Sequence, residues 1–319
     1  MSASGSKKVI FAALIGNTLI AITKFIASAI TGSSAMLSEA IHSLVDTGNQ
    51  GLLLYGIKRA NKPADKDYPF GYGKEIYFWS FIVAILIFAL GAGVSIYEGI
   101  RHIISPEPIT NPYINYIVLG LALLFEGAAW YMALKEFNKG RGKWSYVKAV
   151  RRAKDPSIFV VLFEDSAALL GLMVAFLGVL LTQVTGILWF DGLASIIIGF
   201  ILATIAIWLA IETKGLLIGE SANSEVNQEI HAIATSHSGI DHVNEVLTLH
   251  MGPGFILVNI SIDFMDNLSA AEVEETIAAI DQEIKSRNVL VKRVFIEAER
   301  RKARKQAPDQ IIEKDTDFL

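Results

Sequence analysis

Residues 33–57 read SSAMLSEAIHSLVDTGNQGLLLYGI, a stretch long and apolar enough to cross a bilayer as a helix. The same stretch carries several polar side chains, namely Glu39, His42, Asp46, Asn49 and Gln50. Steps of three and four residues place these side chains on one stripe of a helix. An ionisable group at membrane depth is costly and usually faces a protein interior or a water-filled cavity. The stretch therefore predicts an intramembrane polar site centred on His42 and Asp46. The alternative is that His42 and Asp46 pair with another helix only to hold the bundle together.

Composition places the chain among membrane proteins that also have a soluble portion. Its 319 residues are 52% hydrophobic with a mean hydropathy of +0.45, too apolar for an ordinary soluble domain of this size. The formal net charge of -4 comes without a large basic patch, so we expect no nucleic-acid partner. The chain has no cysteine, which excludes disulfides, thiolate metal ligands and a cysteine nucleophile.

The hydropathy pattern predicts six membrane-spanning helices, each of which needs about 20 apolar residues. The expected spans are residues 9–30, 33–57, 77–103, 113–137, 157–182 and 187–211. Lysine and arginine are concentrated before the first span, in the loop after the second and in the loop after the fourth. The opposite side carries Arg101 near a helix end and little else. We therefore expect both termini in the cytoplasm.

The composition changes after the sixth span, where a small soluble domain begins. Residues 225–236 and 270–285 have helical patterns, and Ser269 is the expected N-cap of the second helix. Residues 242–250, 255–264 and 289–298 are the expected strands. The order αββαβ predicts a small α+β sandwich with its helices on one face of the sheet. We expect a transmembrane domain at 1–212, a connector at 213–224, a cytoplasmic domain at 225–299 and a loosely ordered charged tail at 300–319.

The fifth expected span contains two adjacent carboxylates at the depth expected for His42 and Asp46. Glu164 and Asp165 point about 100° apart on a helix, so only a wide cavity uses both. Carboxylates at this depth need a cation, a proton or a basic partner nearby. One imidazole and two or three carboxylates suffice for zinc, and manganese, ferrous iron and cobalt accept the same set. The alternative for Glu164 is a structural ion pair with Lys24 in the first span.

Glu126 and the metal-ligating histidine are the residues through which protons enter the hypothesis. Glu126 lies near mid-membrane in the fourth span, where it is either a proton carrier or the partner of Lys24. A histidine that ligates a metal must be neutral, so metal binding competes with protons. The same residues can therefore exchange a metal for protons across the membrane.

Several of these features together resemble the cation diffusion facilitator family. They are the six spans, the motif SSAMLSEAIHSLVD, the loop KPADKDYPFGYGKE, the fifth-span aspartate and the αββαβ domain. The resemblance implies a homodimeric, proton-coupled exporter of zinc or another divalent metal, with a ferredoxin-like cytoplasmic domain and no resident cofactor. It also implies that the transport site lies between the second and fifth helices. Carried over to this chain, the site consists of His42, Asp46 and Asp165.

The chain departs from the family pattern at three places. Val161 lies four residues before Asp165, where most zinc-transporting members have histidine or aspartate. The site is therefore one ligand short unless Glu164, Asn49 or water completes it, and Glu164 is the candidate fourth ligand. Tyr68 and Tyr72 replace the histidines of the usual loop motif, which argues against a loop metal site. The strands of the C-terminal domain lack the histidines that bind metal in many members, and we predict no strong metal cluster there.

The segments FEDSAALLG and HSLVDTGNQ resemble the branch that includes the mitochondrial zinc transporter of animals, which favours zinc. A bacterial member of this branch would be a multi-pass protein of the plasma (inner) membrane. We therefore predict a zinc exporter that exchanges metal for protons by alternating access, and not an enzyme. The alternatives are an exporter of manganese, iron or cobalt with the same architecture, a non-transporting metal sensor, and an intramembrane hydrolase that uses a metal-bound water.

Overall fold

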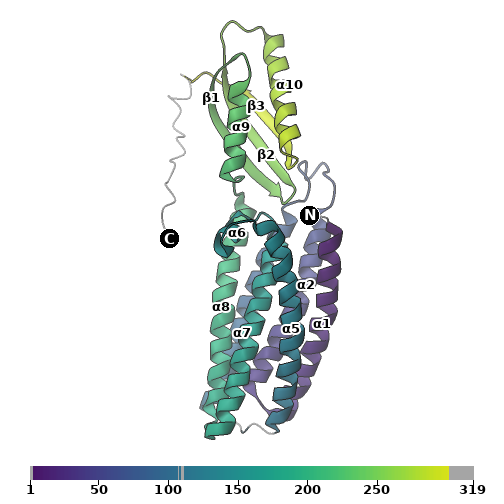
Figure 1. The fold of residues 1–319 in the computed structure, drawn as a ribbon, viewed down its shortest axis with the longest axis vertical. Helices are drawn as coiled ribbons and strands as arrows, with labels where there is room; N and C mark the ends of the chain where they lie inside the picture. The colour runs from purple at the N-terminus through teal and green to yellow at the C-terminus, as the bar shows by residue number, and fades with distance from the viewer. Residues whose placement is uncertain (1–2, 107, 109–110, 302–319) are drawn as a thin grey trace. The chain divides into compact units, whose positions relative to one another are not determined.

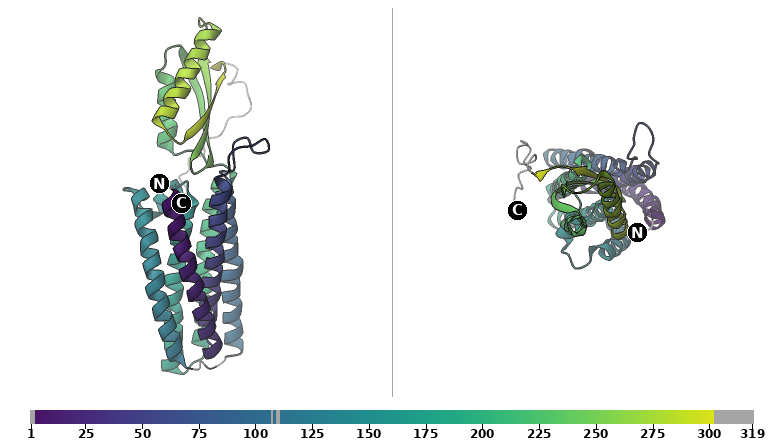
Figure 2. Two further views of the ribbon diagram at one scale, coloured as in Figure 1. Left: turned by 90° about the vertical axis from the view of Figure 1, so that its right-hand side faces the viewer. Right: turned by 90° about the horizontal axis from the view of Figure 1, so that it is seen from above.

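The computed structural model describes residues 3–106, 108 and 111–301. The chain divides into two compact units, Met1–Ile218 and Gly219–Leu319. The first unit is a bundle of long helices that run side by side, and the second is a small α+β unit (Figures 1 and 2). The predicted charged tail falls, from residue 302 onward, outside the described residues.

The helices of the first unit follow the predicted stretches closely. They are α1 (Ala3–Thr31), α2 (Ser34–Ala60), α3 (Glu75–Leu86), the π-helical segment η1 (Ile87–Ala92), α4 (Gly93–Ile104), α5 (Pro112–Arg141), α6 (Tyr146–Arg152), α7 (Pro156–Thr185) and α8 (Trp189–Ile218). Gly32 has φ +72 between α1 and α2, a left-handed conformation that glycine adopts without strain. Ser33 then caps α2 by accepting a hydrogen bond from the Met36 backbone.

Five helical stretches in the described part of the chain are long and apolar enough to cross a membrane. They are Leu14–Thr31, Glu75–Ile104, Pro112–Arg141, Pro156–Thr185 and Trp189–Ile218. The sequence predicted six, and the stretch that is missing from this set is α2. Its 27 residues are enough to span, but its polar side chains lower its hydropathy. Helix α2 packs against α1, α3, α4, α7 and α8, and its polar stripe is buried among them.

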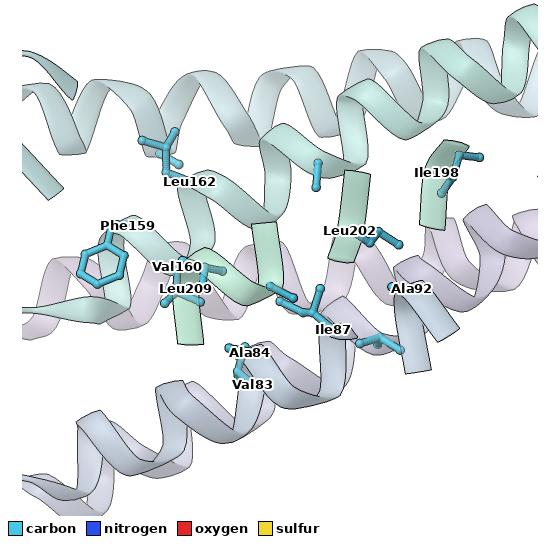
Figure 3. Packing of buried hydrophobic residues seen from close by; sticks show 14 of the residues in the cluster. Val83, Ala84, Ile87, Ala92, Phe159, Val160, Leu162, Ile198, Leu202 and Leu209 are labelled. Carbon is cyan, nitrogen blue, oxygen red and sulfur yellow. The ribbon is translucent and has the colours of Figure 1, made fainter. Parts of the chain in front are cut away.

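Apolar side chains between α3, η1, α7 and α8 form the core of the bundle. Figure 3 shows Val83, Ile87, Phe159, Leu202 and Leu209 converging from these elements. Glycines bring α4 and α8 into close contact: a Cβ at Gly99 would lie 2.6 Å from the Gly192 carbonyl oxygen. Small residues at such positions let membrane helices pack closely.

The second unit contains α9 (Ser224–Ser236), β1 (Ile240–Gly252), β2 (Phe255–Phe264), α10 (Ala270–Arg287) and β3 (Val291–Ala298). The sheet order is β1-β2-β3, with β1 antiparallel and β3 parallel to β2. Every second residue of β2 from Ile256 to Ile262 is buried in a cluster that includes residues of α9 and α10. The predicted N-cap Ser269 is confirmed, and it is part of a capping box in which Ser269 and Glu272 exchange hydrogen bonds at the start of α10. The predicted αββαβ order is therefore confirmed.

Candidate metal centre

Helix α2 holds its polar stripe in the interior of the bundle. The relative exposures of Glu39, His42, Asp46, Asn49 and Gln50 lie between 0% and 4%. His42 and Asp46 are one helical turn apart, and the distance from His42 Nδ1 to Asp46 Oδ1 is 3.3 Å. The structure therefore places the two predicted central residues side by side and away from the surface.

Helix α7 brings two carboxylates to the same region. Glu164 and Asp165 have relative exposures of 1% and 9%. Glu164 Oε1 accepts a hydrogen bond of 2.6 Å from the Asn49 side chain, and the Glu164 carboxyl group lies within hydrogen-bonding reach of Asp46. Asp165 is close enough to Asp46 for their charges to interact. The two adjacent carboxyl groups of α7 are therefore both buried near the polar stripe of α2.

Several polar atoms of this group are buried and have no hydrogen-bond partner. They are both ring nitrogens of His42, Asp46 Oδ1, Asn49 Oδ1 and Glu164 Oε2; His42 Nδ1 and Asp46 Oδ1 lie 3.3 Å apart but without hydrogen-bond geometry. A buried polar atom without a partner is costly, and such atoms are uncommon in folded proteins. Imidazole nitrogen together with carboxylate and amide oxygen is a donor set that first-row divalent metals accept. These atoms, which converge from two helices, fit a cation or protons as their ligand.

The side chains do not form a closed coordination shell as they stand. Among the described residues, no three His, Asp or Glu side chains are grouped tightly enough to hold a metal ion. The pairs are instead His42 with Asp46, Asp46 with Glu164, and Glu164 with Asn49. Metal binding at this position would therefore require the side chains of α2 and α7 to move toward a common centre.

The alternative role suggested for Glu164 is wrong. Lys24 of α1 does not pair with Glu164 but contacts Glu39 of α2 and Glu126 of α5, at 3.0 Å and 2.9 Å. Glu126 is thus the partner of Lys24, one of the two roles that its position suggested. Sequence reasoning placed Glu39 on the polar stripe but missed its ion pair. The one available signal was the need of a buried lysine for a carboxylate at similar depth.

A family model described as the cation efflux transmembrane domain matches residues 10–218 of the chain. The chain belongs to the cation efflux family. These are the cation diffusion facilitators that its sequence resembles.

Curated relatives of this cation efflux protein include transporters of two metals. The mitochondrial proton-coupled zinc antiporter of Homo sapiens is 35% identical over 262 residues, which cover 82% of this chain and 46% of the relative. Metal tolerance protein C4 of Arabidopsis thaliana is 30% identical over 261 residues, covering 81% of this chain and 57% of the relative. The manganese efflux system protein MneP of Bacillus subtilis is 24% identical over 298 residues, covering 91% and 95%.

The chain spans about half the length of the first two of these relatives. Their similarity nevertheless confirms the predicted branch, the one that includes the mitochondrial zinc transporter of animals. The matched region contains both helices that carry the candidate metal centre of this cation efflux protein.

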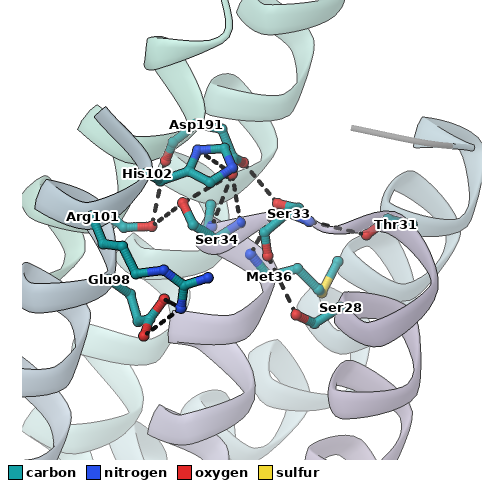
Figure 4. A network of polar contacts seen from close by, with 11 residues as sticks. Ser28, Thr31, Ser33, Ser34, Met36, Glu98, Arg101, His102 and Asp191 are labelled. Atoms are coloured by element: carbon teal, nitrogen blue, oxygen red, sulfur yellow. Dashed lines mark hydrogen bonds and ion pairs between the residues drawn. The ribbon is translucent and has the colours of Figure 1, made fainter. Parts of the chain in front are cut away.

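A second polar network fixes the beginning of α2 in this family member (Figure 4). Asp191, in the first turn of α8, accepts hydrogen bonds from the backbone of Ser34 at 2.6 Å and of Ala35 at 3.3 Å. The hydroxyl groups of Ser33 and Ser34 donate to the same carboxylate at 2.7 Å and 3.0 Å. The side chain of His102 faces it, with Nδ1 3.7 Å from Asp191 Oδ2. Asp191 therefore acts as a cap supplied by another helix, and it anchors the helix that carries His42 and Asp46.

The loop between α2 and α3 is organised by the tyrosines that replace the usual histidines of the family. Tyr72 donates a hydrogen bond of 2.7 Å from its hydroxyl to Asp65 Oδ2, and its ring lies 4.4 Å from that of Tyr68. This hydrogen bond raises the pKa of Tyr72 to about 12 and, with backbone donors, lowers the pKa of Asp65. In this loop the two tyrosines therefore stabilise a turn around Asp65.

Proposed function

We propose that this cation efflux protein exports a divalent metal, most favourably zinc, in exchange for protons. The proposal rests above all on one observation, the buried and unpartnered atoms of His42, Asp46 and Glu164 between α2 and α7. We propose His42, Asp46 and Asp165 as metal ligands and Glu164 as the fourth. The metal is the transported substrate and not a resident cofactor, and we propose no enzymatic activity.

Proton coupling follows from the chemistry of these ligands. Imidazole must be neutral and carboxyl groups must be ionised before they bind a metal, so binding releases protons. When the metal leaves, the buried carboxylates favour protonation, because an unneutralised charge at membrane depth is costly. A site that opens alternately to the two sides would then carry metal one way and protons the other.

The architecture proposed for this cycle has six spans, which are the five apolar stretches and α2 in addition. Support comes from its length of 27 residues and from its position among α1, α3, α7 and α8, which would shield its polar stripe from lipid. We propose domains at residues 1–212 and 225–299, a connector at 213–224, and a ferredoxin-like class for the C-terminal unit. The distribution of lysine and arginine supports cytoplasmic termini. We further propose a homodimer in the plasma membrane, by analogy with the family pattern.

Zinc is favoured over manganese because the human relative, which supports the branch assignment, is a zinc antiporter. The manganese efflux relative supports manganese as the second candidate. The nitrogen and oxygen donor set suits both metals.

Flux measurements in proteoliposomes under a pH gradient test the proposal. Zinc, manganese and cobalt are compared for the wild type, His42→Ala and Asp46→Ala. We expect saturable zinc flux with counter-movement of protons, and loss of both in each variant. Metal binding without flux in folded protein would instead indicate a sensor. Manganese flux without zinc flux would keep the architecture and change the metal.

A further inference from the structure

Lys24, Glu39 and Glu126 form a buried charged cluster that the metal centre does not use. The Lys24 ammonium contacts Glu39 Oε2 at 3.0 Å, Glu126 Oε1 at 2.9 Å and Ser43 Oγ at 2.8 Å. Lys24 and Glu39 are 0% exposed and the side chain of Glu126 is 7% exposed. The cluster thus joins α1, α2 and α5 in the interior of the bundle.

The charges of this cluster do not balance. One ammonium group faces two carboxyl groups, so with all three ionised the cluster carries one unneutralised negative charge. A buried charge without a partner is strongly disfavoured, and more so at membrane depth. An ammonium group has three donors, and here all three are used by Glu39, Glu126 and Ser43. Lys24 therefore has no further donor to offer the remaining carboxylate oxygens.

Those remaining oxygens are buried without hydrogen-bond partners. They are Glu39 Oε1 and Glu126 Oε2. Glu39 Oε1 lies against Gly171 of α7, where a Cβ atom would collide with it. A single proton on either carboxyl group would cancel the excess charge. It would also turn one unpartnered acceptor into a donor.

The surrounding ionisable groups come from α2 and α7. On α2, His42 experiences the charge of Lys24, and Asp46 that of Glu126. On α7, Asp165 also experiences the charge of Glu126. Glu164 is bonded instead to Asn49. Whenever Asp46 or Asp165 is ionised, it adds negative charge to this environment, which then further favours a proton on the cluster.

We propose that Glu39 and Glu126 share one proton beside Lys24, forming a proton-binding site separate from the metal ligands. The site itself follows from the geometry and charge of the cluster. One consequence rests on the proposed function: a divalent cation at His42 and Asp46 would repel this proton. Metal binding would then release a proton from residues that never contact the metal.

Infrared difference spectroscopy on the full chain in nanodiscs, without added metal, tests the site. The observable is the carbonyl stretch of protonated carboxyl groups at neutral pH, identified by its shift in D2O. In Glu126→Gln the amide still accepts from Lys24 and the charges balance, so we expect the band to lose one carboxyl group. In Lys24→Met both glutamates need a proton, so we expect the band to gain the signal of one protonated carboxyl group. Glu136→Gln, a partly exposed position on α5 that pairs with Lys139, is the matched control and should leave the band unchanged.

The same loss in an Asp46→Asn background would show that the proton is not held by the metal cluster. If Glu126→Gln fails to fold, Glu39→Gln carries the same expectation. A band that stays unchanged in both the glutamine variant and Lys24→Met would overturn the proposal. Wild-type zinc flux, measured after the same purified protein is reconstituted into proteoliposomes, keeps the two proposals apart. Absent flux with the expected band changes would refute the transport proposal alone.

Discussion

Asp191 of α8 contacts the start of α2, and replacing it should destabilise the protein more than a change to any other residue of this network. In Asp191→Ala the backbone N–H groups of Ser34 and Ala35 lose their acceptor in a buried position. Each buried donor left unpaired costs about 1–3 kcal/mol, so the two together cost ~2–6 kcal/mol. The hydroxyl group of Ser34 can turn to Ser195, which it already contacts at 3.0 Å. We therefore expect a loss of about 4 kcal/mol in the free energy of unfolding.

Denaturant titration of the full chain in detergent micelles measures this loss. Asp191→Asn keeps one acceptor oxygen but no charge, and we expect it to fall between the wild type and Asp191→Ala. Ser195→Ala is the matched control: it removes only neutral hydrogen bonds of the same network, to the Ser34 hydroxyl and the Asp191 backbone carbonyl, worth about 1 kcal/mol each at most. An Asp191→Ala variant no less stable than Ser195→Ala would refute the idea that this carboxylate caps α2.

Three further predictions concern other parts of the chain. Glu164→Ala should weaken zinc binding at least about tenfold, or ~1.4 kcal/mol, whereas a Glu164 outside the site would leave the affinity unchanged in isothermal titration. Tyr72→Phe should raise the pKa of Asp65 toward its ordinary value in an NMR titration. The stabilising effect of ionised Asp65 is complete above that ordinary pKa and is lost on acidification, while that of neutral Tyr72 is lost as the pH rises toward 12. An Asp65 pKa that is the same in Tyr72→Phe and the wild type would contradict the loop geometry. Ser269→Ala should cost about 1 kcal/mol through loss of the capping box and speed hydrogen exchange at the start of α10. Unchanged exchange there would show that the cap is dispensable.

Much of the fold could be predicted because its signals are local. Long apolar runs mark the helices of the bundle, and the alternation of β2 around Ile260 marks a strand with one buried face. Ser269 followed by Glu272 marks a helix start. The membrane assignment of α2 is harder, since the polar residues that suggest a site also lower the hydropathy by which a span is recognised.

The contacts that complete the interior could not be predicted, because they join residues far apart in the chain. Lys24 and Glu126 are separated by 102 positions, and Ser34 and Asp191 by 157. Nothing near Lys24 indicates which carboxylates it contacts, and Glu164 was an equally reasonable choice. The π-helical turn at Ile87–Ala92 also interrupts a uniformly apolar run that has no local signal for it. Side-chain pairing in a bundle depends on helix rotation and depth, which periodicity fixes only approximately.

Equilibrium zinc binding to the full chain, compared between the wild type and His42→Gln, tests whether the metal site lies inside the bundle. His231→Gln is the matched control, because His231 is exposed on α9 of the C-terminal unit. We expect His42→Gln to abolish tight zinc binding and the proton release that accompanies it, while His231→Gln keeps both. Tight binding that survives His42→Gln and is lost in His231→Gln would contradict this expectation and place the zinc site outside the bundle.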